Sequence, residues 1–468
     1  MRRSSARRFS GPLAVTLAVV AMALALMLAV AMQRLRSPAT PQAPAPPRAQ
    51  AAVTQPAPTP VPRLLMLTTH PQGATITIRA ADGSTQTGTT PFAGTLKGGD
   101  LELAVSLDGY NRMTRRVALD QDRGLDLWLD PKGLLHHKIG ELTTGSNPKQ
   151  VAFSPDGRQL WVTLLGGKGV QVFDPWTLQR LAEIELGAHG AVEVIFSRDG
   201  LTAYVSQMET ASVFEIDRGT FAVRRQLPTK GVWSKVMALS PDERTLYVAN
   251  WSSNDVSEID LGTGTVRRLL ATVGIPRGLY PTPDGKRLLV AGFGHGQLAQ
   301  IDLASGHSQT LLDTGGALRH LVGDPSGGTV YADDMAKNAV YAVDLGSGQP
   351  RKLADTNQKP NTIDLSPDGK VLYISNRGAN GLSYNLPGPE WGSVLAVDTA
   401  TGKVLDAIVG GNQTTGLDVS PSGRLLAFSD FLDNRVQLFE IPPLATLANG
   451  GGGRATTHLA DLPKRPGH

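Results

Sequence analysis

Four basic side chains occupy one repeated position of this chain, and cations at such a spacing could bind an anion together. The position recurs every 42 or 43 residues, except for a last step of 54 residues. Its seven copies are Lys149, Val192, Lys235, Arg277, Arg319, Asn361 and Thr415. Converging cations raise the local concentration of anions, so the pattern predicts an anion-binding site if the fold brings the copies together. The side chains that we expect to bind the ligand are those of Lys149, Lys235, Arg277, Arg319, His320 and Asn361.

Aromatic residues in neighbouring loops extend this hypothesis to a partner surface. We expect Trp251, Tyr384 and Trp391 to contact a partner, because aromatic side chains near a binding site suit protein or sugar contacts. Tyr384 belongs to a 12-residue insertion that breaks the repeat between Arg377 and Trp391. Two plainer interpretations stay open: the basic side chains are solvated loop residues, partly neutralised by Glu193, and the insertion is a tolerated surface loop.

Few other residues suggest catalysis. The chain has no cysteine, which excludes disulfides, thiolate metal sites, cysteine nucleophiles and covalently attached c-type haem. His295, His320, Asp333 and Asp334 could in principle hold a metal, but they lack ligand spacing, and the two aspartates are expected to form an acid pair in a loop. We therefore expect no catalytic residue, no metal and no cofactor.

A repeat of about 42 residues must position these side chains. Each copy reads as an apolar strand, an S-P-D-G-like turn, a strand such as L-Y-V, a V-x-x-I-D strand, a glycine turn and a last strand. The turn serine or its equivalent is found at Ser154, Ser197, Ser240, Thr282, Asp324, Ser366 and Ser420. Because the turn aspartates recur with the repeat, their role is expected to be structural. The last copy ends after three strands, so the apolar stretch Leu134–Leu142 is predicted to supply the missing outer strand.

The repeat resembles the YVTN-type seven-bladed β-propellers. The resemblance is carried by Leu246–Asn250 (LYVAN), Leu372–Asn376 (LYISN) and the S-P-D-G turns. It implies a seven-bladed β-propeller over residues 133–444. It does not specify a function, because related propellers include binding proteins, surface-layer components, lactonases and quinoprotein-like enzymes.

A second, smaller β-domain is predicted over residues 63–132. Period-2 alternation, as in Thr75–Ile78, is broken by glycine and proline turns, which indicates a small antiparallel sandwich. The segments Pro71–Ala74 (PQGA), Gly88–Pro91 (GTTP) and Gly109–Tyr110 resemble the PEGA domain, with Gln72 in place of the usual glutamate. The resemblance implies a surface module that acts as a spacer or contact. The fold class expected for the whole chain is therefore all-β with one N-terminal transmembrane helix.

The N-terminal residues predict a membrane attachment. Residues 1–10 are a basic segment that should stay in the cytoplasm, and residues 11–33 are an uncharged apolar stretch long enough to be a transmembrane helix or signal anchor. A cleaved signal peptide is the alternative. Residues 34–62 form a Pro/Ala-rich linker, and residues 445–468 are expected to be a disordered tail.

Charge and organisation together suggest a role in the cell envelope. Residues 1–36 carry six arginines and no acid, while the whole chain has a net charge of only +4, so we expect no nucleic-acid partner. We expect a membrane-anchored, extracytoplasmic propeller, periplasmic or at the cell surface, that binds an envelope protein or an anionic ligand at its mouth. A propeller hydrolase of the lactonase type, a quinoprotein-like enzyme, and a purely structural envelope component are the alternatives.

Overall fold

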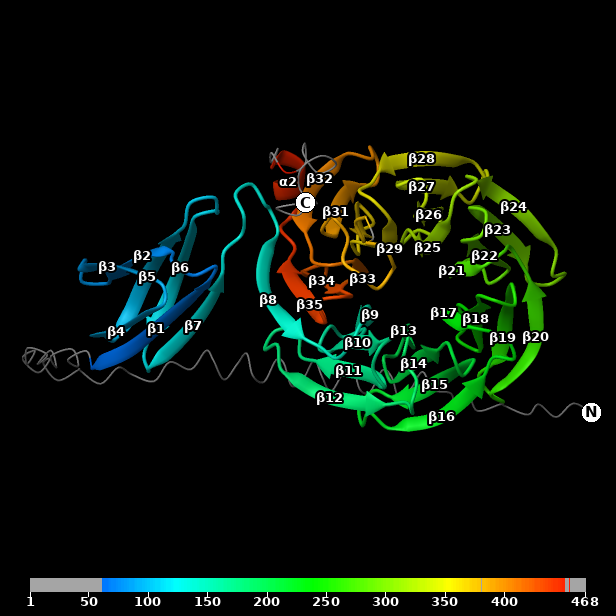
Figure 1. Ribbon diagram of the computed structural model, residues 1–468, viewed down its shortest axis with the longest axis horizontal. Helices are drawn as coiled ribbons and strands as arrows, with labels where there is room; N and C mark the ends of the chain where they lie inside the picture. The colour runs from blue at the N-terminus through cyan, green and yellow to red at the C-terminus, as the bar shows by residue number, and fades with distance from the viewer. Residues whose placement is uncertain (1–60, 380, 451–453, 455–468) are drawn as a thin grey trace, which may run out of the picture. The chain divides into compact units, whose positions relative to one another are not determined.

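The computed structural model describes residues 61–379, 381–450 and 454 of the 468-residue chain. These residues form β-strands almost throughout (Figure 1). No helix among them is long and apolar enough to span a membrane. The predicted transmembrane helix lies outside the described residues, as does all of the linker up to residue 60.

The first strands form a small two-sheet domain. One sheet has the order β4-β1-β7 and the other the order β3-β2-β5-β6. The strands are β1 (Pro62–His70), β2 (Thr75–Ala80), β3 (Thr85–Thr89), β4 (Phe92–Lys97), β5 (Gly99–Ser106), β6 (Met113–Leu119) and β7 (Arg123–Trp128). Alternate residues such as Leu65, Ile76 and Leu103 are buried between the two sheets, as the period-2 pattern predicts.

Seven four-stranded sheets follow and form a ring, which is the propeller (Figure 1). From the inner to the outer strand, the first four blades are β9 (Pro148–Phe153), β10 (Leu160–Leu164), β11 (Gly169–Phe173) and β12 (Arg180–Glu185); β13 (Val194–Phe196), β14 (Thr202–Gln207), β15 (Ser212–Asp217) and β16 (Val223–Pro228); β17 (Ser234–Leu239), β18 (Thr245–Asn250), β19 (Asp255–Asp260) and β20 (Thr265–Ala271); and β21 (Pro276–Pro281), β22 (Arg287–Gly292), β23 (Gln297–Asp302) and β24 (Ser308–Asp313). The last three are β25 (Leu318–Gly323), β26 (Thr329–Asp334), β27 (Ala339–Asp344) and β28 (Pro350–Asp355); β29 (Pro360–Leu365), β30 (Val371–Asn376), β31 (Ser393–Asp398) and β32 (Val404–Val409); and β33 (Thr414–Val419), β34 (Leu425–Asp430), β35 (Arg435–Glu440) and β8 (His137–Thr143).

The ring closes as the sequence predicts. Strand β8, which precedes the first blade in the chain, pairs antiparallel with β35 and becomes the outer strand of the seventh blade, with Leu142 opposite Val436. Middle strands such as β10, β18, β30 and β34 are buried along their whole length, because each blade covers both faces of its neighbour.

The S-P-D-G turns hold the inner two strands of each blade together. In the first turn the Ser154 hydroxyl donates to Asp156 at 2.6 Å, and the backbone N–H of Arg158 donates to the same carboxylate. Gly157 has a φ of +69°, which glycine adopts readily. The same serine–aspartate bond recurs at Asp199, Asp242 and Asp368, so these acids belong to the turns, as predicted.

Two half-buried aspartates join the last blades to the first. Asp364 accepts a hydrogen bond from the backbone N–H of Val419 at 2.8 Å, and Asp418 accepts one from Phe153 at 2.6 Å. Burial raises the pKa of Asp364 to about 6, and burial together with the nearby Asp364 raises the pKa of Asp418 well above its usual range. The two carboxyl groups therefore link the inner strands of blades six, seven and one as a proton-sharing pair.

The end of the described chain differs from the predicted tail. Residues Leu444–Asn449 form the short helix α2 rather than disordered chain. Leu447 is buried in a cluster with Leu134 and Phe439, and Leu444 packs against the same cluster. Two leucines three residues apart lie on one helical face, and this apolar contact orders the segment. Residues 451–453 and 455–468 lie outside the described chain.

Candidate functional site

A small cavity of about 30 Å³ lies where the inner strands of six blades converge. All six residues predicted to bind a ligand line it, together with Gln150, Val192, Glu193, Val236 and Thr362. Thr415, the seventh copy of the repeated position, is not among the lining residues; its carbonyl group instead accepts a hydrogen bond from the Asn361 side chain at 2.9 Å. The cavity has room for about two water-sized groups.

The inner strands direct these side chains inward through a repeated local geometry. Lys235, Arg277, Arg319 and Asn361 are each the second residue of their strand. At each of these residues the pairing register with the next strand shifts, and such a bulge redirects a side chain. In several copies of the repeat, the residue two positions before the repeated position is a non-glycine residue with positive φ: Asn147, Trp233, Ile275, Lys359 and Gln413. This backbone costs about 1 kcal/mol or more at each position, so packing must hold it in place.

The cations around the cavity have no carboxylate partner within ion-pair distance among the described residues. Lys235 Nζ lies 3.4 Å from the centre of the Trp251 ring, and the Arg277 guanidinium lies 4.2 Å from the same ring. Arg319 Nε donates to the carbonyl of Asn361 at 2.8 Å. Aromatic faces and a carbonyl group therefore take the place of ion-pair partners. The carboxyl groups of Glu193 and Asp333 offset the positive charge of Arg277 and Arg319 only from beyond ion-pair distance.

Burial and mutual repulsion change the protonation of these groups. Burial, followed by repulsion from Arg277 and Arg319, lowers the pKa of Lys235 to about 5. Burial, followed by repulsion from neighbouring arginines, also lowers the pKa of Lys149 well below its usual range. Glu193 also lines the cavity, and burial raises its pKa although the surrounding cations oppose that rise. At neutral pH Lys235 is therefore largely an uncharged amine, the charged form of Lys149 is disfavoured, and the arginines carry most of the positive charge.

Several buried polar atoms beside the cavity have no hydrogen-bond partner. They include Nε of Arg277, Oδ1 of Asn361 and Oδ2 of Asp333. Arg277, Asn361 and Asp333 are 8%, 2% and 0% exposed. Unpaired buried polar atoms are costly, and their occurrence together is typical of a site that binds a ligand or ordered water.

Arg377 is a fifth cation of this site that the sequence did not reveal. It follows β30 at the base of the insertion, and its charge lowers the pKa of Lys149, Lys235 and Arg277. A guanidinium N–H of Arg377 donates to the Gln413 side chain, while its Nε has no partner. Arg377 is the first residue of the insertion, and this position could have pointed to it. The repeat alone did not place the insertion near the cavity. We call Lys149, Lys235, Arg277, Arg319 and Arg377 the cationic ring.

Comparison with known proteins identifies the scaffold that carries the cationic ring. Residues 107–280 and 278–448, more than half of the chain, match the family model described as lactonase, 7-bladed beta-propeller. The chain belongs to this family. Residues 63–131 match the PEGA domain, so both predicted resemblances are confirmed.

Individual relatives of this propeller family member are more distant. Antigen Lp49 of Leptospira interrogans (serogroup Icterohaemorrhagiae serovar copenhageni, strain Fiocruz L1-130) is 35% identical over 143 residues, which are 30% of this chain and 31% of the antigen. The match thus spans less than a third of that relative's length. A solved structure titled Kuenenia stuttgartiensis hydrazine synthase has a TM-score of 0.56 at 21% identity, covering 64% of this chain and 97% of that chain. At that identity the likeness shows the fold alone.

The histidines and acids considered for a metal do not form a metal cluster in the described part of this propeller. Asp333 and Asp334 are completely buried at the end of β26, which contradicts the prediction of an acid pair in a loop. Asp334 accepts from Thr314 and from the backbone N–H groups of Ala317 and two later residues, and Asp333 accepts from the N–H of His320 at 2.6 Å. Both therefore hold the inner strand β25 in position, and burial raises the pKa of Asp333 to about 6.

The three aromatic residues predicted to contact a partner lie in different environments. Trp251 is half-buried beneath Lys235 and Arg277, and its indole N–H has no partner. Tyr384 is 65% exposed on the insertion, and Trp391 at the end of the insertion is half-buried. Only Tyr384 is thus freely accessible, together with the neighbouring Leu382 and Leu386.

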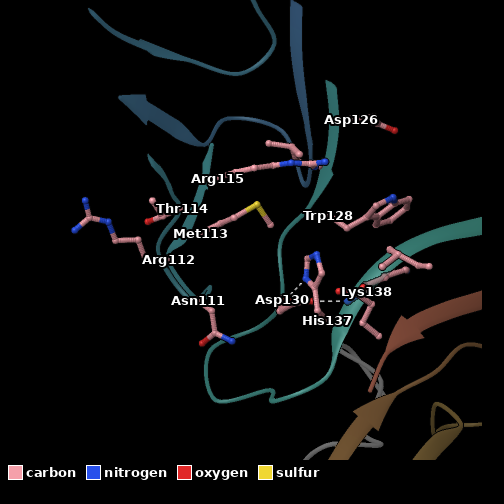
Figure 2. Close-up of a pocket in the computed structure, with 13 residues that line it drawn as sticks. Asn111, Arg112, Met113, Thr114, Arg115, Asp126, Trp128, Asp130, His137 and Lys138 are labelled. Carbon is pink, nitrogen blue, oxygen red and sulfur yellow. Dashed lines mark hydrogen bonds and ion pairs between the residues drawn. The ribbon is translucent and has the colours of Figure 1, made fainter. Parts of the chain in front are cut away.

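A larger cleft of about 640 Å³ lies beside the segment that leads into β8 (Figure 2). His137 Nδ1 lies 2.6 Å from the Asp130 carboxylate, and the N–H of Lys138 donates to the same group at 2.9 Å. The hydrogen bond to Asp130 raises the pKa of His137. Lys138 Nζ lies 4.2 Å from the centre of the Trp128 ring. Because none of the described residues that line this cleft has a buried polar atom without a partner, and Arg112 and Arg115 are exposed, this cleft is the weaker candidate for a ligand site.

Proposed function

We propose that this propeller binds a small anionic group, a carboxylate or a phosphate, within the cationic ring. The group belongs either to a small molecule or to an acidic segment of an envelope protein. The proposal is supported by one observation above all: four basic side chains line the cavity, and Arg377 lies near enough to repel them. Among the described residues none of the five has a carboxylate partner within ion-pair distance, and two of the three guanidinium groups have an unpaired Nε. An anion would supply the missing counter-charge and hydrogen-bond acceptors.

The proposal is tested by reversing two charges of the cationic ring. We expect Lys235→Glu with Arg277→Glu to weaken the binding of phosphate or oxalate by about tenfold or more, because each lost charge-assisted hydrogen bond is worth about 1.5–3 kcal/mol. Binding is measured by titration calorimetry at two salt concentrations. The matched control is Arg158→Glu with Lys286→Glu, an equal charge change at two exposed turn positions. Equal affinity in the wild type and both variants would exclude the site. If the charge-reversed variant does not fold, the same binding measurement is made on Lys235→Met with Arg277→Met.

The family description favours hydrolysis of a lactone as a second candidate function. The carboxylate product of such a reaction is an anion that the cationic ring could accept, and Glu193 is the carboxyl group that lines the cavity. The same variants distinguish the candidates. Turnover of a lactone that is lost in the charge-reversed pair would assign catalysis to this cavity, whereas anion binding without turnover assigns binding alone.

We further propose that the propeller is held outside the cytoplasm by residues 11–33 as an uncleaved anchor. The support is the apolar stretch of about 20 residues that follows four arginines. Extraction of membranes at high pH should leave the protein in the pellet. Release of the full-length chain into the soluble fraction would refute the anchor, and a shortened soluble chain would indicate a cleaved signal peptide.

A further inference from the structure

Lys149 is more accessible than Lys235, Arg277 and Arg319, the other three basic residues that line the cavity. It is half-buried and lines the cavity, whereas Lys235, Arg277 and Arg319 are only 7–8% exposed. Lys235 also lies against the Trp251 ring, which covers one side of its amine. Lys149 has neither a hydrogen bond nor an ion pair nor an aromatic contact with the described residues. Its amine is therefore free to meet a ligand that enters the cavity.

The surroundings of Lys149 make this amine nucleophilic. Burial comes first among the causes that lower its pKa well below the usual range, followed by repulsion from Arg319, Arg377 and Arg277. An uncharged lysine amine attacks carbonyl carbon, and enzymes commonly obtain one by desolvation beside other cations. The same arginines offer N–H donors to a carboxylate. Lys149, an amine without a partner among the described residues, and the guanidinium groups of Arg277 and Arg319 thus line one small cavity. Burial and the neighbouring charges favour the uncharged form of this amine.

We propose that Lys149 forms a reversible imine with small oxo acids, in which a carboxylate lies next to the carbonyl carbon. This inference rests on the anion binding proposed above and names the class of ligand. Because the cavity is small, the ligand that tests the proposal is the most compact member of the class, glyoxylate. The arginines would hold the carboxylate and thereby place the carbonyl carbon near the amine.

The step balances without an oxidant or a reductant. The nitrogen lone pair of Lys149 forms a bond to the carbonyl carbon, and the carbonyl oxygen takes up a proton to give a carbinolamine. The carbinolamine then loses its oxygen as water and forms the C=N bond. Over the whole reaction, the two hydrogens of the amine and the carbonyl oxygen leave as one water molecule. Glu193 lines the same cavity and holds a proton more firmly than a free glutamate, so it is placed to protonate the departing oxygen.

Reductive trapping on the full-length protein tests this proposal. The protein is treated with glyoxylate and sodium cyanoborohydride, and its peptides are analysed by mass spectrometry. We expect saturable modification of Lys149 that exceeds modification of the exposed Lys352 about tenfold or more, because each unit of lowered pKa raises the uncharged fraction of an amine about tenfold. Oxalate, which has carboxylates but no reactive carbonyl group, should protect Lys149.

Two variants and one binding measurement separate the outcomes. Lys149→Met should lose the trapped product, whereas Lys359→Met, altered just before the inner strand β29, should retain it. Equal modification of Lys149 and Lys352 in the wild-type protein would overturn the imine, and this result does not depend on how a variant folds. Oxalate binding by calorimetry without any trapped product would refute the imine alone. Absence of both would refute the imine and the proposed anion binding together.

Discussion

Lys235→Met is expected to raise the free energy of unfolding by about 1–3 kcal/mol. It should weaken anion binding by up to about tenfold, because it removes one hydrogen-bond donor of the cavity. In the folded state the Lys235 amine is buried, repelled by Arg277 and Arg319, and has no carboxylate partner within ion-pair distance. Methionine has a similar length, and its thioether packs favourably on an aromatic ring such as that of Trp251. The variant removes an unfavourable amine without opening a cavity.

The gain from Lys235→Met should depend on pH. An unfolded lysine keeps its proton up to about pH 10.5, whereas burial first, and then the neighbouring arginines, lower the pKa of folded Lys235 to about 5. Between these values the unfolded state binds more protons, so this residue makes the wild type more stable as the pH rises. The variant lacks that contribution, and its advantage should be larger at pH 6 than at pH 9.

Urea unfolding at both pH values, with calorimetric titration of oxalate, measures the two effects. The matched control is Lys352→Met, because Lys352 is exposed and forms a surface ion pair with Asp355. It should change stability by less than about 1 kcal/mol and leave binding unchanged. A Lys235→Met protein that is less stable than the wild type would show that this lysine supports the fold rather than a ligand.

His136→Ala is expected to lower the free energy of unfolding by about 3–5 kcal/mol, the cost of leaving a buried carboxylate without its partner. His136 Nδ1 lies 2.7 Å from the Asp406 carboxylate, and Nε2 lies 3.2 Å from the Tyr373 hydroxyl. All three side chains are buried. Burial alone would raise the pKa of Asp406, but hydrogen bonds from His136 and from the backbone lower it below its usual value. Alanine would leave this carboxylate buried without its main partner.

The position of His136 in the chain increases the effect. His136 directly precedes β8, the strand that closes the ring, and its network attaches this segment to strands β30 and β32 of the sixth blade. His137→Ala is the control, because the His137 side chain is 40% exposed and pairs with Asp130. It should cost about 1 kcal/mol or less. Similar losses for both variants in urea unfolding would refute a special role of the buried network.

The periodic part of the site could be predicted from the sequence. Residues at equal distances before equivalent turns occupy equivalent places in the blades, so the alignment was sufficient to bring Lys149, Lys235, Arg277 and Arg319 to one cavity. The place of Arg377 near the cavity could not be predicted in this way, because Arg377 begins an insertion where the repeat is broken. The burial of Asp333 and Asp334 was not predicted either, because two adjacent acids are most often solvated. Asp334 ends the second strand of its blade as Asn250 and Asn376 end theirs, and all three side chains are completely buried.

The sequence by itself determined the number of blades, the turns, the closing strand and the end of the channel at which the basic residues gather. These properties follow from local spacing, because a repeat of fixed length reproduces the same strands and turns in every copy. Only the tertiary structure decided that the basic residues of the cavity have no counter-ion at ion-pair distance in the described part of the chain, that the cavity is small, and that Lys149 is more accessible than Lys235. Those properties depend on which side chains of different blades meet and how much water they exclude, and contacts between distant residues decide both. The spacing of the repeat thus determines where the basic side chains lie, and the packing around them determines how their pKa values shift.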